Sequence, residues 1–197
     1  MPATARAPAS AAPAAEAGPA AGGAGPGGLA GPAPGGSAAG GSAAGEEFRA
    51  AFRRFPAGVA VVSALAGGRP AGFTATSLVS VSLDPPLVSF CVGLQASCWP
   101  AIQAAEHFGV SMLAAHQEPV ARRFATSGID RFAGTGWHLD PPGVPLLDDA
   151  AAWLTCRIEH RLPVGDHTLV IGRVLRAAAS AQTAPLIYHT GRYLRPT

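Results

Sequence analysis

Two short segments of the sequence place polar groups where they could hold a ligand. Residues 72–77 (GFTATS) set a glycine and three hydroxyls at the end of a strand-like run. Hydroxyls and backbone N–H groups at such a place can donate to a phosphate or to a ring carbonyl. Gly165-Asp166-His167 forms a turn before another strand-like run, which would hold an imidazole at the rim of a β-structure. Hydroxyl-rich strands and solvated histidines are also common without a ligand, so neither pattern decides the function alone.

Several other kinds of chemistry are disfavoured by the residues available. All 14 Lys and Arg positions are Arg, which excludes a P-loop lysine and a Schiff-base lysine. The histidines His160, His167 and His189 lack the short spacing of a metal triad, so we expect no metal site. The adjacent carboxylates of Asp148 and Asp149 would point to opposite faces of a strand, and we assign them no acid–base role.

The cysteines predict structural rather than reactive thiols. Cys91, Cys98 and Cys156 are odd in number and lack C-x-x-C spacing, which argues against a disulfide scaffold and a zinc ribbon. The sequence also has no G-x-S-x-G nucleophile elbow and no local motif for thiol catalysis. We therefore expect free, buried thiols.

The composition allows one domain and therefore one main site. The chain has 197 residues, a formal net charge of +2 and 48% hydrophobic residues, enough for a single sizeable core. Residues 1–45 are almost entirely Ala, Gly, Pro and Ser, so we expect a disordered tail followed by one domain over residues 46–197. Residues 23–28 satisfy the G-x-G-x-x-G dinucleotide fingerprint, but the flanking strand and helix that it requires are not predicted.

Charge and hydropathy argue against two classes of partner. The arginines are scattered, with no run longer than the pairs Arg53-Arg54 and Arg122-Arg123, so no nucleic-acid surface is indicated. No apolar run approaches the ~20 residues that cross a bilayer, and the first residues lack the bulky apolar stretch of a secretory signal. We expect a soluble cytoplasmic protein that does not bind membranes.

The elements that must position these groups are mostly strands. Residues 59–65 and 71–76, separated by a Gly-Gly-Arg-Pro turn, predict a hairpin. Two further strands are expected on either side of Pro85-Pro86, because proline cannot continue a paired ladder. Another strand is expected over residues 108–113, and residues 127–149 are expected to be loop.

Short helices are expected between the strands. Residues 46–54 carry Phe48 and Phe52 at helical spacing, which predicts an amphipathic helix laid on a core. Ser97 is placed to cap a second helix that begins near Trp99-Pro100. That helix is expected to run to about His107, and a third to cover residues 118–124.

The C-terminal third continues the strand pattern. Residues 153–162 alternate, which predicts a half-exposed antiparallel strand. Its buried face would carry Leu154, Cys156, Ile158 and Leu162, and its exposed face Thr155, Arg157, Glu159 and Arg161. Strand-like residues 167–176 and 186–188 follow, with a turn at Gly191. Six or seven strands with short helices and no βαβ alternation indicate a mainly β antiparallel barrel rather than a Rossmann domain.

Taken together, these segments resemble the flavin reductase family, the small reductase components of two-component flavin-dependent monooxygenases. The resemblance covers about residues 48–195. It is carried by the segments FPAGV (55–59), GFTATS (72–77), SVSLDPPLV (80–88), GDH (165–167) and YHTGRY (188–193). The departures are the N-terminal tail and the use of Arg in place of Lys, including Arg131 before Phe132.

The resemblance implies an FMN-binding split β-barrel with short flanking helices that forms a homodimer, with the flavin in a groove near the subunit interface. The implied cofactor-binding residues are Thr74, Ala75, Thr76, Ser77, Cys91, Val92, Gly93, Ser97, Phe132, His167 and Tyr193. Among these, the segment from Cys91 to Ser97 would reach the flavin phosphates, and Tyr193 would lie beside the nicotinamide. His167 is the implied catalytic residue, in a positioning role.

The implied reaction is hydride transfer from nicotinamide C4 to flavin N5. FMN or FAD would be the flavin, NADH or NADPH the co-substrate, and a flavin-dependent monooxygenase the partner that receives reduced flavin. Two alternatives stay open at this point: a non-enzymatic flavin or haem carrier on a related barrel, and an FMN-dependent oxidase of the pyridoxamine phosphate oxidase type. The second would need a basic cluster for the substrate phosphate, which the scattered arginines do not supply.

Overall fold

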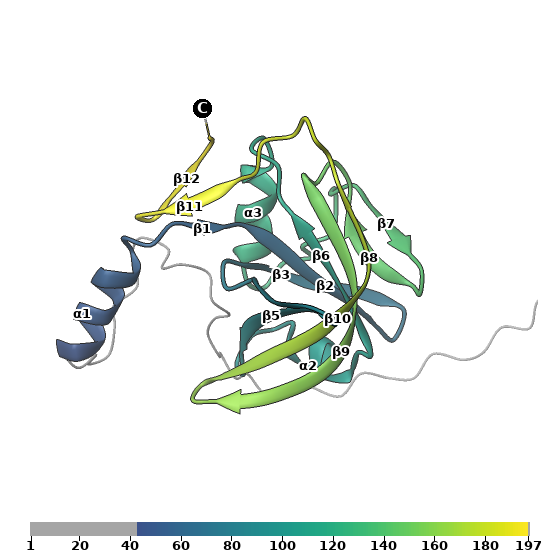
Figure 1. The fold of residues 1–197 in the computed structure, drawn as a ribbon, viewed down its shortest axis with the longest axis horizontal. Coiled ribbons are helices and arrows are strands. Elements are labelled where there is room, and N and C mark those ends of the chain that lie inside the picture. The colour runs from purple at the N-terminus through teal and green to yellow at the C-terminus, as the bar shows by residue number, and fades with distance from the viewer. Residues whose placement is uncertain (1–42, 197) are drawn as a thin grey trace, which may run out of the picture.

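A computed structural model of the protein describes residues 43–196 and consists mainly of antiparallel strands (Figure 1). Of the predicted tail, residues 1–45, all but residues 43–45 lie outside the described residues. The helices are α1 (Ala43–Phe52), α2 (Trp99–Ala104) and α3 (Glu118–Ala125). The strands are β1 (Ala57–Gly58), β2 (Ala60–Ala66), β3 (Arg69–Ala75), β4 (Val79–Leu83), β5 (Pro86–Gly93), β6 (His107–Met112), β7 (Trp137–Asp140), β8 (Val144–Leu147), β9 (Ala152–Val164), β10 (His167–Ala179), β11 (Ile187–His189) and β12 (Arg192–Leu194).

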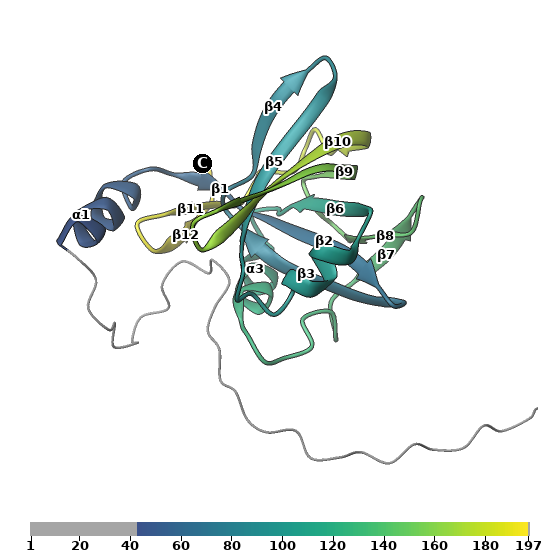
Figure 2. The same cartoon turned by 90° about the horizontal axis from the view of Figure 1, so that it is seen from below.

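One seven-stranded antiparallel sheet, in the order β3-β2-β6-β9-β10-β5-β4, forms the body of the domain. The predicted hairpin is confirmed, because β2 and β3 pair from Ala60↔Ala75 to Ala66↔Arg69. Gly67 and Gly68 make its turn with positive φ, a conformation that side chains disfavour. The strands expected beside the proline pair are also confirmed as β4 and β5, and Figure 2 shows their hairpin projecting from the other strands.

The sheet has an opening where its two edges approach each other. Strands β3 and β4 are the edges, and the chain passes from one to the other through residues 76–78. Strand β4 pairs with β5 only as far as Val79↔Ser89, so residues 91–93 of β5 have no partner in β4. We call residues 74–77 together with residues 91–93 the seam.

Two hydrophobic clusters hold the sheet in this shape. The first contains three neighbouring rings from three different strands. The ring centroid of Phe90 lies 5.1 Å from that of Phe108, which it meets edge-on, and 6.0 Å from that of Phe73. The second joins α3 to the sheet and to the C-terminal segment through Phe124 and Leu186, both buried. Aromatic pairs at these separations add to the stabilisation from area burial, so the seam rests on a rigid support.

The prediction of a loop over residues 127–149 was wrong in one part, because strands β7 and β8 pair within it. Each strand has only four residues among Gly and Pro, which is too short for a periodic signal. Buried Asp140 fastens this hairpin to the main sheet by accepting hydrogen bonds from Thr155 Oγ1 at 2.8 Å and Arg176 Nη1 at 2.5 Å. Thr155 is therefore buried, although the predicted alternation placed it on the exposed face. The register between β9 and β10 also shifts between Val174 and Arg176.

Helix α1 does not lie on the core as predicted. It buries none of its residues, with Phe48 61% and Phe52 62% exposed, and it stands away from the sheet (Figure 1). Leu162 was expected on the buried face of β9 but is 45% exposed near the hairpin tip. In a single chain, the apolar side chains of Phe48, Phe52 and Leu162 are therefore exposed.

The second predicted helix also differs in its ends. The residue before α2 is Cys98 rather than Ser97, and no side chain caps the helix. Exposed Ser97 is therefore not the cap, and α2 ends at Ala104 instead of about His107, where β6 begins. Helix α3 confirms the third prediction. None of the helices in residues 43–196 is long and apolar enough to span a bilayer.

Candidate functional site

The seam brings together the two segments that the sequence analysis selected for a flavin. Ser77 Oγ accepts a hydrogen bond from Cys91 N at 3.0 Å and lies 3.4 Å from Cys91 O. One hydroxyl thus occupies both backbone groups of Cys91 and holds the crossing between β3 and β4 against β5. At Cys91, this side-chain contact takes the place of a strand ladder between β5 and β4.

The seam residues divide into supporting and accessible groups. Thr74 is buried and donates to the carbonyl oxygen of Ala121 at 2.7 Å, which ties β3 to α3. Ala75 and Val92 are buried in the first hydrophobic cluster, so they can offer a ligand only their backbone. Thr76 is exposed and Cys91 half-buried, and these two side chains can contact a ligand directly.

The turn between β9 and β10 places His167 at the same end of the sheet. His167 pairs with Gly93 across the β10–β5 ladder, and Leu94 N donates to the carbonyl oxygen of Asp166 at 3.0 Å. Gly165 makes the turn with a φ of 60°, where glycine is favoured. Three of the predicted segments, residues 74–77, 91–93 and 165–167, are therefore linked to one another in space.

The imidazole of His167 is oriented by its neighbour. Its Nδ1 lies 2.5 Å from Asp166 Oδ1, and the imidazole side chain is 24% exposed against 93% for the carboxylate. The hydrogen bond and the charge of His167 hold the pKa of Asp166 below its ordinary value. Since the carboxylate is an acceptor, the hydrogen bond assigns a proton to Nδ1, and Nε2 is the ring nitrogen left to contact a ligand.

The segment after β5 meets an arginine that the sequence analysis did not select. Arg131 donates to Gly72 O at 2.7 Å and to Thr126 O at 2.8 Å, and its guanidinium lies beside the Cys98 thiol. Burial raises the pKa of Cys98, and Arg131 partly opposes that rise. Exposed Ser97 is next to this thiol. The position of Arg131 directly before Phe132 was the only signal in the sequence that could have identified it.

Phe132 is buried against β3. Its ring is 6% exposed and lies edge-on to Phe124, 4.9 Å away, and to Trp137, 5.5 Å away. A Cβ added at Gly72 would stand 3.4 Å from this ring and 2.8 Å from Val62 O, so only glycine fits at that point of β3. Phe132 therefore fixes the path of β3 toward the seam.

Tyr193 is held against α3, and this helix connects it to the other predicted residues. The Arg122 guanidinium lies 5.1 Å above its ring centroid, and Tyr188 packs edge-on at 5.2 Å. Burial raises the pKa of the Tyr193 hydroxyl. Because Ala121 of the same helix accepts from Thr74, α3 connects Tyr193 to the seam.

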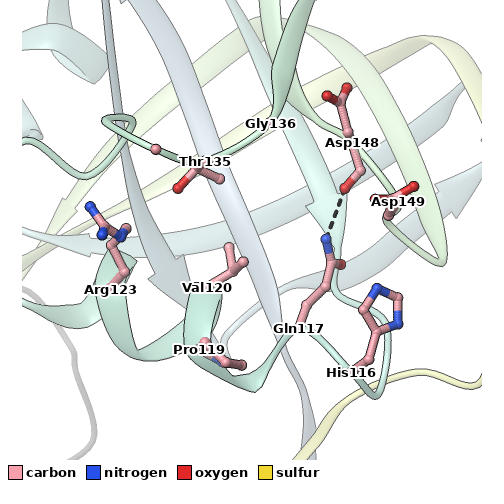
Figure 3. Close-up of a pocket in the computed structure, with 10 residues that line it drawn as sticks. His116, Gln117, Pro119, Val120, Arg123, Thr135, Gly136, Asp148 and Asp149 are labelled. Atoms are coloured by element: carbon pink, nitrogen blue, oxygen red, sulfur yellow. Dashed lines mark hydrogen bonds between the residues drawn. The ribbon is translucent and has the colours of Figure 1, made fainter.

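A separate pocket of about 370 Å³ opens at the start of α3 (Figure 3). Its lining includes Gln117, Arg123 and Asp148, but none of the predicted site residues. The polar groups here are largely occupied: Gln117 Nε2 donates to Asp148 O at 2.8 Å, and Arg123 donates to Ala133 O at 2.7 Å. These hydrogen bonds thus hold the 134–136 loop in place. Within residues 43–196, no group of three or more His, Cys, Asp or Glu side chains is arranged to bind a metal.

Comparison with known proteins identifies the family. Residues 52–196 match the flavin reductase like domain. The chain is 47% identical over 156 residues to an NADH:FMN oxidoreductase of Rhodococcus qingshengii, covering 77% of this chain and 81% of that protein. It is 34% identical over 146 residues to the reductase subunit HsaB of a flavin-dependent monooxygenase of Rhodococcus jostii, covering 74% and 75%.

A solved structure agrees with these sequence matches. The NADH:FAD oxidoreductase SgcE6 of Streptomyces globisporus, in complex with NAD and FAD fragments, is 38% identical and superposes with a TM-score of 0.74, covering 77% of this chain and 92% of that one. The predicted mainly β split-barrel fold is thereby confirmed. The predicted resemblance is also confirmed, and the chain belongs to the flavin reductase like domain family.

Proposed function

We propose that this chain transfers a hydride from NADH to FMN or FAD at the seam and passes the reduced flavin to a partner monooxygenase. The observation that carries this proposal is the linkage of residues 74–77, 91–93 and 165–167, through the Ser77–Cys91 hydrogen bond, the pairing of Gly93 with His167 and the Leu94–Asp166 hydrogen bond. Relatives named as NADH:FMN and NADH:FAD oxidoreductases support the choice of substrates.

The flavin would lie along the seam. Its ring edge is polar and its ring faces are apolar, which suits a place where unpaired backbone groups border a hydrophobic cluster. Thr76 and Ser97 offer exposed hydroxyls, and half-buried Cys91 lies between them in the sequence. Arg131 keeps the segment around Cys98 close to β3 and supplies positive charge near the proposed phosphate position.

The nicotinamide would be positioned by His167. With Nδ1 bonded to Asp166, the imidazole presents Nε2 to the site, where it can accept an N–H from the carboxamide group. The hydride chemistry belongs to the two rings, and the chain contributes their alignment and the exclusion of water. Tyr193, fixed against Arg122, would cover the nicotinamide from the C-terminal side.

We propose that two copies form the working enzyme. The outer edge of the β4–β5 hairpin exposes Val79, Val81 and Leu83, the last at 88%, and the β9–β10 tip exposes Leu162 and Val164. Exposed apolar side chains on a free strand edge favour pairing with a second chain. A second copy seated there would cover the apolar side chains that this chain leaves open beside the seam.

We also propose a partner and a compartment for the reaction. A relative named as the reductase subunit of a flavin-dependent monooxygenase supports an oxygenase as the recipient of reduced flavin. All three cysteines are free thiols, as expected in the reducing cytoplasm, where we place the reaction.

The test is the loss of near-ultraviolet absorbance of NADH on mixing with purified protein, with NADPH in parallel and with FMN, FAD or no added flavin. We expect flavin-dependent oxidation of NADH. Folded protein that binds flavin but oxidises neither dinucleotide would refute the reductase function and return the carrier and oxidase alternatives. Reduced flavin delivered to an added monooxygenase would then be measured as formation of its hydroxylated product.

A further inference from the structure

The short helix α2 is held at its C-terminal end by a half-buried arginine with no role in the proposed chemistry. Arg161, on β9, donates through Nη2 to the carbonyl oxygens of Ala105 and, at 3.3 Å, Ile102. These are carbonyls of the last turn, which a helix leaves without partners of its own. No ion pair in residues 43–196 includes Arg161, so its charge is directed at the helix end alone.

The β9–β10 hairpin also holds the N-terminal end of the segment that leads from β5 into α2. The segment begins at Gly93, which pairs with His167 in β10, and continues with Leu94, whose N–H is bonded to Asp166 O. Residues 93–105 are therefore attached to the β9–β10 hairpin twice, once near its tip and once through Arg161. Between the two attachments lie Ser97 and Cys98, where we place the flavin phosphates.

The attachment at Arg161 is specific and leaves little freedom. Its Nε is buried without a hydrogen-bond partner among the described residues. The guanidinium therefore keeps its bonds to these carbonyls although one of its donors stays unsatisfied. Arg157, on the same strand, is by contrast exposed and bonded only to Glu159 at 3.4 Å. Of these two arginines of β9, Arg161 alone touches α2.

We propose that Arg161 is a positioning residue that makes the flavin-binding segment and the His167 turn one rigid unit. This inference rests on the proposed function of the seam. With Arg161 in place, residues 93–98 are ordered before the flavin arrives, and binding does not have to order them. The same attachment fixes the distance between the flavin segment and the imidazole that seats the nicotinamide.

The test compares Arg161→Met with the matched control Arg157→Met and with the conservative Arg161→Lys. Flavin dissociation constants are measured by quenching of flavin fluorescence, and KM for flavin and NADH and kcat by NADH oxidation. We expect Arg161→Met to raise the flavin Kd and both KM values about tenfold, equivalent to about 1.4 kcal/mol each, with a smaller change in kcat. Arg161→Lys should recover at least half of this effect on a logarithmic scale, and Arg157→Met should stay within twofold of the wild type.

Unchanged flavin Kd and KM values in folded Arg161→Met protein, whatever its melting temperature, would overturn the proposal. So would an equal effect of Arg157→Met. If Arg161→Met is recovered only unfolded, Arg161→Lys carries the test alone, with an expected rise of about threefold in flavin Kd and a value equal to wild type as the contrary result. Wild-type protein that binds flavin without oxidising NADH would refute the reductase function, while the flavin Kd of the variants would still decide the role of Arg161.

Discussion

The imidazole of His167 is fixed by the residue before it, so the pair should act as a unit. Replacing His167 by Ala removes the proposed acceptor for the carboxamide, and a neutral hydrogen bond contributes about 0.5–1.5 kcal/mol. We therefore expect His167→Ala to raise KM for NADH about 3- to 10-fold and to leave flavin Kd within about twofold. Asp166→Ala frees the ring without removing it and should have a smaller effect of the same kind. An unchanged KM for NADH in His167→Ala would contradict the assignment.

The Cys156 thiol gives the protein an alkaline limit. Burial raises the pKa of Cys156 from 9.0 to about 12, so the unfolded thiol ionises while the folded one keeps its proton. Stability from this group is complete below pH 9 and is lost as the pH rises toward 12. Urea unfolding from pH 9 to 11 should show a slope steeper in wild type than in Cys156→Ala by up to about 1.4 kcal/mol per pH unit. Parallel slopes would show that the thiol ionises equally in both states.

At the scale of elements, the close approach of β10 to the core depends on Gly172. A Cβ at this residue would stand 2.3 Å from the ring of Phe108, which is fully buried and cannot move aside. Gly172→Ala should therefore lower the free energy of unfolding by about 1–3 kcal/mol, as overpacking usually does. Gly58→Ala is the control, because an added Cβ there meets nothing within 4 Å. Equal denaturation midpoints for the two variants would contradict this account.

The elements also show where the sequence was informative. The β2–β3 hairpin, the β4–β5 pair and α3 could be predicted because glycine or proline marks a boundary of each: the Gly-Gly-Arg-Pro turn, Pro85-Pro86 and Pro119. The β7–β8 hairpin could not, since four-residue strands have no period to read. The candidate site was predicted from residues such as Thr76 and His167, whose types suggest ligand contacts. Arg131 and Arg161, by contrast, donate to backbone carbonyls that only the fold brings near.

At the scale of the whole molecule, the exposed apolar side chains predict a dimer. Val81→Asp on the free edge of β4 would place a charge in the proposed interface and should convert the dimer to a monomer in size-exclusion chromatography with light scattering. The matched control is Leu139→Asp on β7, which is similarly exposed, at 52% against 50%, but lies in another sheet. A monomeric wild type, or a dimeric Val81→Asp, would argue against this interface.

The errors at Phe48, Phe52 and Leu162 have the same origin at this scale. A periodic pattern identifies an apolar face but does not say whether the same chain or a second one covers it. For all three residues the apolar side chain was identified correctly, but the surface expected to cover it was not.

The seam also has a consequence for how the protein must be handled. Unpaired strand edges can act as templates on which other chains add strands, the first step of aggregation. A bound flavin would occupy those edges and so prevent another chain from pairing with them. Preparations stripped of flavin should accordingly become turbid at lower temperatures than flavin-saturated ones. The stability of the protein in storage would then depend on whether flavin occupies the seam.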